Sequence, residues 1–177
     1  KNLLWPGEVS WFAQSSGTTS ARSKFIPVTK ESLEDCHFKG GKDVLSIYCH
    51  NNPEAQLFTG KGLTVGGSNS INQFNRGSYY GDLSAVLTHN LPKWAEYHRT
   101  PDLEVALMDQ WEEKINLMIE QTKNIDVTSI SGVPSWTLVL CNRLLEKTRK
   151  SNLQEVWPNL EVYFHGGVSF HPYKESF

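Results

Sequence analysis

Hydrophobic and polar positions along the chain follow two spacings, one typical of strands and one typical of helices. Short runs rich in β-branched and aromatic residues, bounded by glycine, proline or asparagine, predict strands. Such runs lie at residues 9–12, 25–28, 56–70, 125–130 and 160–164. Residues 71–80 instead mix asparagine, glutamine and arginine with three aromatic residues, which favours a surface loop.

Apolar residues three or four positions apart predict helices. The clearest pattern runs from residue 101 to residue 123. Its repeating apolar positions include Val105, Met108, Ile115 and Ile119. Further helices are predicted at residues 29–39, 82–91 and 135–150, and from residue 172 onward. Thr29 is the expected cap of the first of these, and the Gly40-Gly41 pair is expected to interrupt it. Residues 43–50 suit a buried helix or a strand equally well, and the stop signal Asn-Asn-Pro at 51–53 favours the helix.

The order of these elements indicates the fold class. From residue 101 onward helices and strands alternate, which favours a parallel sheet with helices packed on its faces. The chain shows no internal repeat and no linker that would separate two domains. We therefore expect an α/β fold with a mostly parallel sheet flanked by helices. In such a sheet, ligands bind beyond the carboxyl ends of the strands.

The segment from Ser15 to Lys24 has the composition of an oxyanion site. Its ten residues hold four serines, two threonines, one glycine and two cations, and a large apolar side chain follows only at Phe25. Gly17 permits backbone conformations that other residues resist, and the hydroxyl groups and Lys24 add donors around negative oxygens. Phosphate is the expected ligand. A solvated turn is the alternative, and the segment lacks the second glycine of a Walker-type phosphate loop.

Two further segments follow predicted strands. Residues 131–136 (Ser-Gly-Val-Pro-Ser-Trp) lead into a predicted helix, and residues 165–169 (His-Gly-Gly-Val-Ser) leave the strand at 160–164. Gly166 and Gly167 would let a flat base lie against bare backbone, which suits adenine. A glycine hinge between strand and helix is the alternative. We expect all three candidate segments at the carboxyl edge of one sheet, and we predict a nucleotide-binding site there.

Composition narrows the function classes. The 177 residues suffice for a core, and a net charge of −2 with a pI near 6.3 gives no reason to expect nucleic acid or a membrane as partner. No long apolar run is present. Cys36, Cys49 and Cys141 lack disulfide or metal-ligand spacing, so free thiols and a cytoplasmic location are expected. The histidines also lack ligand spacing, and no metal site is predicted among these residues.

The candidate segments resemble the sequence blocks of a known family. Ser-Ser-Gly-Thr-Thr at 15–19 with Lys24, the segment 131–136, Val-Trp-Pro-Asn at 156–159 and the His-Gly-Gly block at 165–173 follow one another in the family's order. On these blocks the chain resembles the Gretchen Hagen family of auxin-responsive acyl-acid amido synthetases, which are adenylate-forming enzymes. It is more similar to bacterial than to plant members, and the resemblance spans nearly the whole chain.

The resemblance implies a ligase that uses ATP and Mg²⁺ to activate a carboxylic acid as an acyl adenylate and then joins the acyl group to an amino acid. It also implies the fold of the large domain of an adenylate-forming enzyme. The residues that it assigns to the ATP phosphates are Ser15, Ser16, Gly17, Thr18, Thr19 and Lys24. Those assigned to the adenine and acyl pocket are Gly166, Gly167, Val168 and Ser169, and those assigned to the acyl wall are Val133, Pro134 and Trp136.

The resemblance also sets limits on this chain. Ala21 stands where the family's loop usually has glycine, and alanine restricts the backbone there. The family's acidic metal-binding motif and its small carboxyl-terminal catalytic domain have no counterpart in these residues. We therefore expect residues 1–177 to be a partial N-terminal adenylation domain with its catalytic residues elsewhere. Alone it is expected to be inactive and to self-associate through uncovered apolar faces.

Two alternative functions stay open from the sequence. An acyl-coenzyme A ligase begins with the same adenylation step, so the same motifs would serve it. A noncatalytic nucleotide-binding module would keep the same fold, and Ala21 favours that option. The identities of the acid and of the acceptor, and the oligomeric state, do not follow from the sequence.

Overall fold

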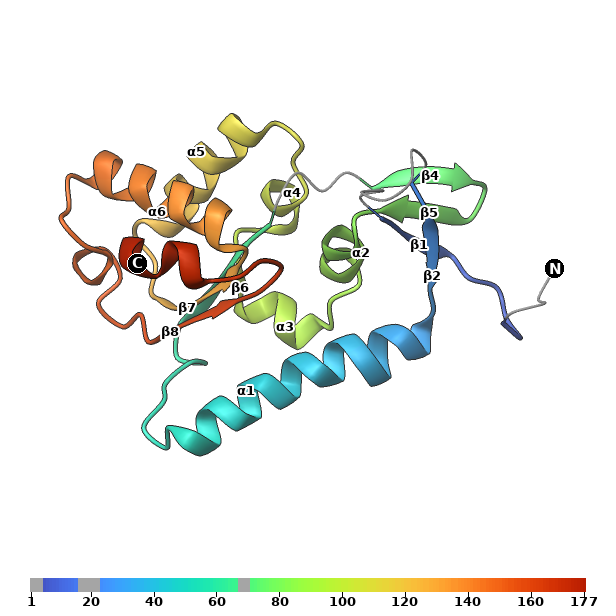
Figure 1. Ribbon diagram of the computed structural model, residues 1–177, viewed down its shortest axis with the longest axis horizontal. Coiled ribbons are helices and arrows are strands. Elements are labelled where there is room, and N and C mark those ends of the chain that lie inside the picture. Colours follow the sequence, from blue (N-terminus) through green and yellow to red (C-terminus); the bar gives the residue numbers. More distant parts are fainter. Residues whose placement is uncertain (1–4, 16–22, 67–70) are drawn as a thin grey trace. The chain divides into compact units, whose positions relative to one another are not determined.

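The computed structural model describes residues 5–15, 23–66 and 71–177 (Figure 1). The chain divides into two compact units. Unit 1 comprises Lys1–Pro53 and Asn69–Leu91, and unit 2 comprises Glu54–Ser68 and Pro92–Phe177. Each unit is therefore built from two separate stretches of the chain. Each also has its own sheet and its own apolar core.

Sheet A, in unit 1, has four strands in the order β2-β1-β5-β4. They are β1 (Trp11–Gln14), β2 (Phe25–Val28), β4 (Asn72–Asn75) and β5 (Ser78–Gly81). β1 and β2 form an antiparallel pair on either side of the hydroxyl-rich segment, whereas β1 and β5 run parallel. The prediction that this segment connects two strands is confirmed.

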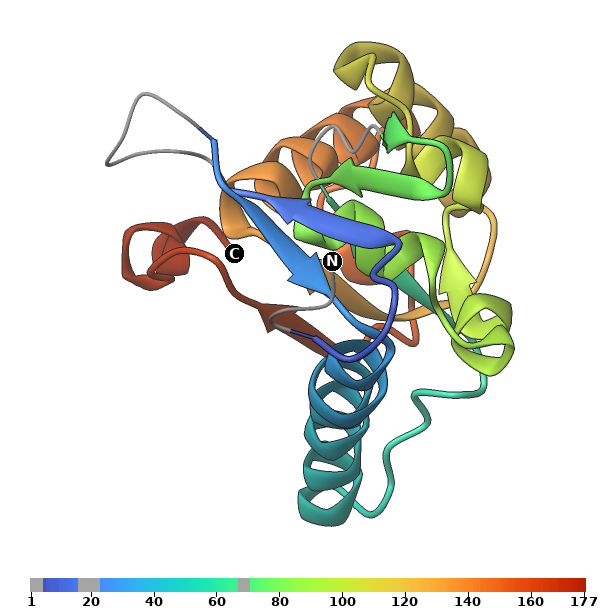
Figure 2. The ribbon, with the colours of Figure 1, turned by 90° about the vertical axis from the view of Figure 1, so that its right-hand side faces the viewer.

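A helix carries the chain away from sheet A. The Thr29 hydroxyl caps it by accepting a hydrogen bond from the Ser32 N–H at 3.1 Å. The π-helical η1 (Ser32–Phe38) continues into α1 (Lys39–Asn51), and Figure 2 shows the two as one helix. The predicted interruption at Gly40-Gly41 is wrong. Each glycine costs about 1 kcal/mol of helix propensity, which the flanking helical turns outweigh.

Residues 71–80 form a hairpin rather than the loop that the sequence favours. β4 and β5 pair antiparallel across a tight turn in which Gly77 has a φ of 91°. All four side chains of β4 are exposed, so no hydrophobic alternation marks this edge strand in the sequence. The strand exists because β5 is held between β4 and β1, and β1 lies far away along the chain.

The core of unit 1 lies on one face of sheet A. Its buried members are Ala13, Val28, Leu33 and Val86. Val86 comes from α2 (Leu83–His89), which confirms the helix predicted at 82–91. Strand alternation places Phe25, Phe74 and Tyr80 on the opposite face, where their ring centroids lie 5.0 to 5.4 Å apart.

Sheet B, in unit 2, is parallel throughout and has four strands in the order β6-β3-β7-β8. They are β3 (Lys61–Val65), β6 (Arg99–Thr100), β7 (Val127–Gly132) and β8 (Val162–His165). Over both sheets, four strand pairings of the described residues are parallel and two are antiparallel. The predicted α/β fold with a mostly parallel sheet is confirmed.

Helices cover one face of sheet B (Figure 1). The helices of unit 2 are α3 (Lys93–His98), α4 (Leu103–Ala106), α5 (Trp111–Thr122) and α6 (Pro134–Thr148), with the 3-10 helices η2 (Leu153–Glu155) and η3 (His171–Ser176). Side chains of α4, α5 and α6 share one core with those of β3 and β7. Its buried members are Leu63, Val65, Val105, Ile115, Met118, Ile119, Val127, Ile130, Leu140, Leu144 and Trp157.

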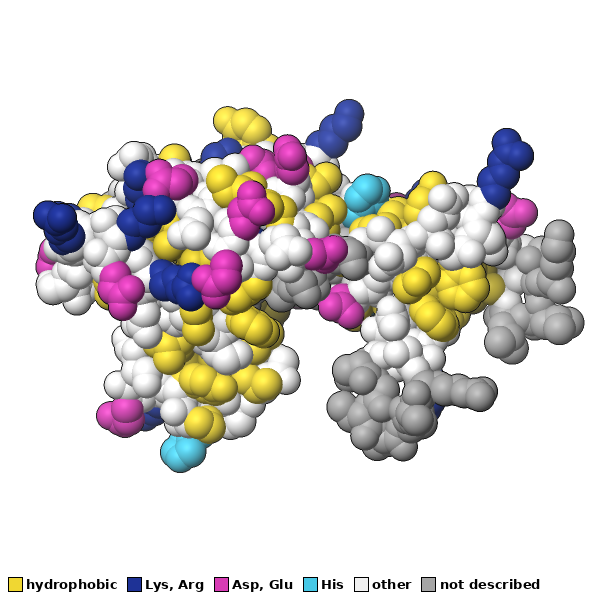
Figure 3. Space-filling model, turned by 90° about the horizontal axis from the view of Figure 1, so that it is seen from above, with side chains coloured by type: hydrophobic (Ala, Val, Ile, Leu, Met, Phe, Trp, Pro, Cys, Tyr) yellow, Lys and Arg dark blue, Asp and Glu magenta, His cyan; other side chains and the backbone are white. Residues whose placement is uncertain are grey.

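The solvent side of these helices is charged. The ion pairs Glu112–Arg143 and Glu120–Lys147 link α5 to α6. Figure 3 shows acidic and basic side chains interspersed over the upper side of unit 2. Because these pairs are solvent-exposed and screened by water, they contribute little, and the apolar core supplies most of the stability.

The single helix predicted at residues 101–123 is in fact two helices. α4 ends at Ala106 and α5 begins at Trp111. Asp102 caps α4 by accepting a hydrogen bond from the Val105 N–H at 2.9 Å. The break redirects the chain so that Val105 and the apolar side of α5 reach the same core. The connecting residues 107–110 are about one helical turn long, so the apolar spacing in the sequence does not reveal the break.

Lys114 on α5 is a buried cation next to this break. Its ammonium group donates to the Ala106 carbonyl at the end of α4 over 2.7 Å, and the side chain is buried. Burial lowers the pKa of Lys114 to about 8, and the nearby Asp109 opposes this shift. The hydrogen bond satisfies one of the carbonyls that a helix end leaves without a helical partner.

Trp157 joins the segment after α6 to α5. It is fully buried, and its indole N–H donates to the Thr122 carbonyl at 2.9 Å. We predict that Trp157→Phe lowers the free energy of unfolding by about 2–4 kcal/mol, because it leaves a cavity and removes one of the two hydrogen bonds that the Thr122 carbonyl accepts. The matched control Trp94→Phe, at a 43% exposed side chain, should change it by less than about 1 kcal/mol. Urea unfolding followed by circular dichroism measures both, and equal losses would contradict this account.

The buried Lys114 predicts a pH dependence of stability. Between pH 8 and pH 10.5 the unfolded chain keeps the proton that the folded chain has lost, so folding is favoured as the pH rises. Relative to Lys114→Met, the wild-type free energy of unfolding should increase across this window, by at most about 3 kcal/mol. Urea unfolding of both proteins at a series of pH values checks this. A difference that stays constant with pH would show that Lys114 titrates normally.

Candidate functional site

The carboxyl edge of sheet B brings two of the candidate segments together. The strand register pairs Val65 of β3 with Gly132 of β7, and Gly132 with His165 of β8. The three strands therefore end level at one edge. The chain leaves β7 through the 131–136 turn and leaves β8 through residues 166–169. The prediction that these two segments lie at one sheet edge is confirmed.

Close packing fixes the turn after β7. A Cβ on Gly132 would lie 2.5 Å from the Val65 carbonyl oxygen and 3.0 Å from the Thr137 hydroxyl, so glycine is required. Val133 is the N-cap of α6 and Pro134 is its first residue, a position where helices leave the N–H unpaired anyway. The Thr137 hydroxyl donates to the Val133 carbonyl at 3.0 Å, which closes the first turn of α6.

The segment after β8 is exposed and rich in glycine. Its exposed residues are Gly166, Gly167, Val168 and Ser169. Gly167 has a φ of 82°, in the left-handed region that favours glycine, and a Cβ there would lie 3.2 Å from Val133 Cγ2. The segment therefore touches the turn after β7. At Gly166 no atom of the described residues lies within 4 Å of the place of a Cβ, so one side of its backbone is uncovered.

A ring stack flanks this glycine segment. His165 and Phe170, at its two ends, stack with ring centroids 4.3 Å apart and an interplanar angle of 19°. Tyr163 lies 5.7 Å from His165 and stacks on Phe177 at 5.1 Å. Our sequence reasoning did not single out these rings. The sequence signal that could have identified them is the presence of aromatic residues on both sides of the glycine pair.

The hydroxyl group of Tyr163 links three elements at this edge. It donates to the Gly132 carbonyl at 3.0 Å and lies 3.2 Å from the Thr137 hydroxyl. The Tyr163 hydroxyl has a single proton, and since Thr137 gives its own proton to Val133, the Thr137 oxygen can only share the Tyr163 proton with the Gly132 carbonyl. Burial raises the pKa of Tyr163, so the hydroxyl group is protonated at neutral pH. One side chain thus connects β8, β7 and α6.

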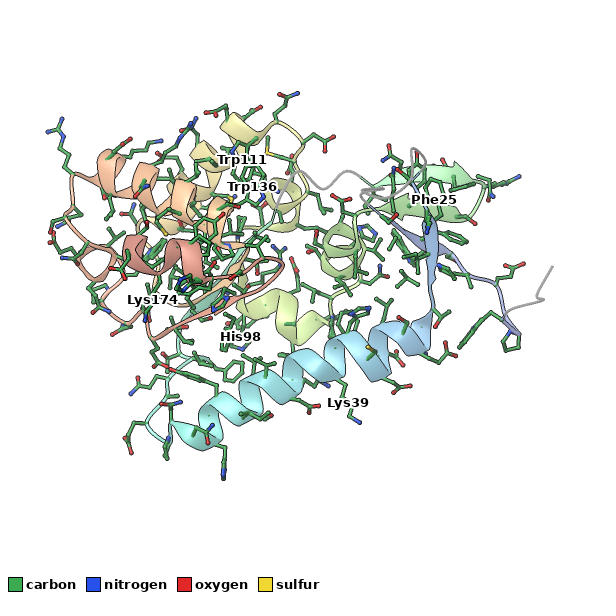
Figure 4. All side chains as sticks on the ribbon, in the orientation of Figure 1. Phe25, Lys39, His98, Trp111, Trp136 and Lys174 are labelled. Atoms are coloured by element: carbon green, nitrogen blue, oxygen red, sulfur yellow. The ribbon has the colours of Figure 1, made fainter. Side chains whose placement is uncertain are left out.

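The residues that the resemblance assigns to the acyl wall lie in different environments. Val133 is half-buried, Pro134 is buried and Trp136 is 39% exposed. The Trp136 ring packs edge to face on Trp111 of α5, with centroids 4.3 Å apart (Figure 4). The structure therefore places Val133 against the glycine segment and Trp136 against α5.

The hydroxyl-rich segment connects β1 and β2, which lie in sheet A. Its two ends are joined, because the Ser15 N–H donates to the Lys24 carbonyl at 2.9 Å and the Lys24 N–H donates to the Ser15 hydroxyl at 3.1 Å. The phosphate-site candidates Ser16, Gly17, Thr18 and Thr19 lie outside the described residues. The expectation that all three segments share the edge of one sheet is wrong, since β1 and β2 pair in sheet A.

In the part of the chain that the structure describes, neither the cysteines, nor groups of potential metal ligands, nor the helices indicate a second functional site. Within residues 5–15, 23–66 and 71–177, no group of three or more His, Cys, Asp or Glu side chains could hold a metal ion. The three cysteines carry free thiols, and burial raises the pKa of Cys141 to about 12, which makes this thiol unreactive. In the same part of the chain no helix is both long and apolar enough to cross a membrane.

The fold is α/β, and the turn after β7 and the glycine segment after β8 form a candidate site at the carboxyl edge of a parallel sheet. The family model for the GH3 family N-terminal domain matches residues 1–177. The chain therefore belongs to the GH3 family, the Gretchen Hagen family that its sequence resembles. A comparison with curated proteins found no match.

Two neighbouring glycines allow a direct test of the glycine segment. We predict that Gly167→Ala lowers the free energy of unfolding by about 1–2 kcal/mol, because its positive φ strains any Cβ and Val133 lies in the way. Gly166→Ala should change it by less than about 0.5 kcal/mol, since that position is open. Thermal unfolding of the two variants measures the difference. Equal melting temperatures would contradict the left-handed conformation at Gly167.

Proposed function

We propose that this domain binds ATP and a carboxylic acid, and that the enzyme forms an acyl adenylate and then joins the acyl group to an amino acid. Membership of the GH3 family, which is known for acid–amino acid ligases, supports the proposal. The observation that carries it is the contact between the turn after β7 and the glycine segment after β8. Parallel α/β sheets bind their ligands at this edge.

The glycine segment suits the adenine of ATP. The backbone of Gly166 is uncovered, and the left-handed conformation of Gly167 turns the chain directly after it, so a flat base can fit against the open side of Gly166. Backbone N–H and C=O groups there can pair with the edge of a purine. The stack of His165 on Phe170 joins the two ends of the segment, so the surface is formed before a ligand binds.

The turn after β7 suits the carboxylic acid. Val133 lies against Gly167, and the neighbouring Val168 is 48% exposed, so apolar side chains border the place for an acyl chain. Trp136 adds a partly exposed aromatic ring in the same turn. α6 begins here, and the unpaired N–H groups of its first turn favour the negative charge of a carboxylate.

The hydroxyl-rich segment is the proposed phosphate site. We assign Ser16, Gly17, Thr18 and Thr19 to the ATP phosphates, with Ser15 and Lys24 at the joined ends of the segment. When bound, ATP with Mg²⁺ would supply the adenylyl group, with pyrophosphate as the leaving group, and part of the charge neutralisation. The amide, hydroxyl and ammonium donors of the segment stabilise negative charge on phosphate oxygens. Placement and charge neutralisation suffice for this reaction, so no nucleophilic side chain is invoked.

We also propose that residues 1–177 form the nucleotide-binding and acyl-binding part of a larger adenylation domain. The matched family region is described as an N-terminal domain, which supports this view. Formation of the amide would then depend on residues outside this region, and residues 1–177 alone should not complete the reaction.

Exchange of labelled pyrophosphate into ATP tests the proposed function. We predict carboxylate-dependent exchange with one class of acid when the longest natural chain that contains residues 1–177 is given aromatic and aliphatic acids. Replacement of Ser16, Thr18 and Thr19 by alanine should lower this exchange at least about 100-fold, because donors to the phosphates are lost. The circular dichroism spectrum should be unchanged.

The same assay also provides a control variant and outcomes that would contradict the proposed function. Ser23→Ala, in the same segment but outside the phosphate assignment, should keep the exchange rate within about twofold. Exchange that survives the triple substitution would contradict the phosphate assignment. ATP binding without exchange for any acid would indicate a noncatalytic nucleotide-binding module. Product formation with coenzyme A and not with amino acids would indicate an acyl-coenzyme A ligase.

A further inference from the structure

Tyr163 supports both segments of the candidate site without belonging to either. It lies on β8, before the glycine segment, and its side chain reaches across to α6. Its hydroxyl group donates to the Gly132 carbonyl at 3.0 Å and lies 3.2 Å from the Thr137 hydroxyl. These two partners flank Val133 in the turn after β7.

A short series of contacts leads from this hydroxyl group to the glycine segment. Thr137 donates to the Val133 carbonyl at 3.0 Å, and Val133 Cγ2 lies 3.2 Å from the place of a Cβ on Gly167. Gly132 packs closely on β3 as well, since a Cβ there would lie 2.5 Å from the Val65 carbonyl oxygen. A shift of Gly132 or Thr137 would therefore move Val133 relative to Gly167.

The ring of Tyr163 supports the other segment. It stacks on Phe177 with centroids 5.1 Å apart and an interplanar angle of 24°. Its centroid also lies 5.7 Å from that of His165 and 6.2 Å from that of Phe170, the two rings that flank the glycine segment. The hydroxyl group of Tyr163 thus contacts the turn after β7, and its ring packs against the His165–Phe170 stack that flanks the glycine segment.

We propose that Tyr163 is a positioning residue that sets the spacing between the turn after β7 and the glycine segment, and thereby the affinity for the carboxylic acid. The inference rests on the proposed function, which places the acid at Val133 and adenine at the glycine segment. The hydroxyl group contacts protein groups rather than reacting atoms. Its loss therefore alters binding of the acid more than the chemical step.

Kinetics of the Tyr163→Phe variant test this role. In the pyrophosphate exchange assay with the longest natural chain, the KM for the acid should rise about fivefold, the usual effect of losing one partly buried hydrogen bond. The kcat should change by less than about twofold, because uniform binding is lost. Tyr173→Phe, on the neighbouring η3, is the matched control and should leave both values unchanged. An unchanged KM in Tyr163→Phe would overturn the proposal.

If Tyr163→Phe folds poorly, a second variant can still test the positioning role of Tyr163. Thr137→Val keeps the shape of a fully buried side chain and removes the hydroxyl group that Tyr163 meets. It should raise the KM for the acid in the same direction. In the double variant the two effects should combine to less than their product, since both act through one network. Fully multiplicative effects would show that the residues act independently and would overturn the proposal.

Hydrogen exchange separates this inference from the proposed function. Without ligands, amides of residues 131–137 and 165–170 should exchange at least about threefold faster in Tyr163→Phe, while those of α5 stay unchanged. If the wild type shows no pyrophosphate exchange, the proposed function fails, and this measurement still reports on Tyr163. Faster exchange confined to the two segments supports the positioning role, and equal exchange in both proteins overturns it.

Discussion

The placement of β7 between β3 and β8, parallel to both, is the constraint on which unit 2 depends. Parallel strands need a crossover, so α6 must return over the face of the sheet before β8 begins. All strands then end at one edge, where irregular backbone is exposed. Gly132 permits this arrangement, because any side chain there would collide with the Val65 carbonyl. The candidate site is thus a direct result of how the strands pair.

Two buried side chains with polar groups help to pack the helices of unit 2. Lys114 is buried among apolar side chains, yet it satisfies the Ala106 carbonyl where α4 ends. Trp157 does the same for Thr122 near the end of α5 while it fills the core. Both residues combine burial with a hydrogen bond to a helix end. For the Ala106 carbonyl this bond avoids the larger penalty of an unpaired buried acceptor, whereas the Thr122 carbonyl also accepts from the Ile125 N–H at 3.3 Å.

Family membership and structure contribute different parts of the functional argument. Membership of the GH3 family provides the class of chemistry in which the three candidate segments make sense. The structure adds the contact between Val133 and Gly167, the stack of His165 on Phe170 and the network around Tyr163. These contacts explain how exposed, glycine-rich backbone can keep a defined shape at the end of a strand, since side chains from neighbouring elements support it from below.

The sequence by itself determined the features that depend on local signals. It predicted the α/β class, the strands beside the hydroxyl-rich segment, the helices at 43–50 and 82–91, and the turn into α6, because caps, prolines and apolar spacing act within a few residues. Only the tertiary structure decided that 71–80 is a hairpin, that 101–123 is two helices and that the strands flanking the hydroxyl-rich segment lie in a separate sheet. Strand pairing and shared cores depend on contacts between residues that are distant in the sequence, and the local spacing of apolar residues does not predict such contacts.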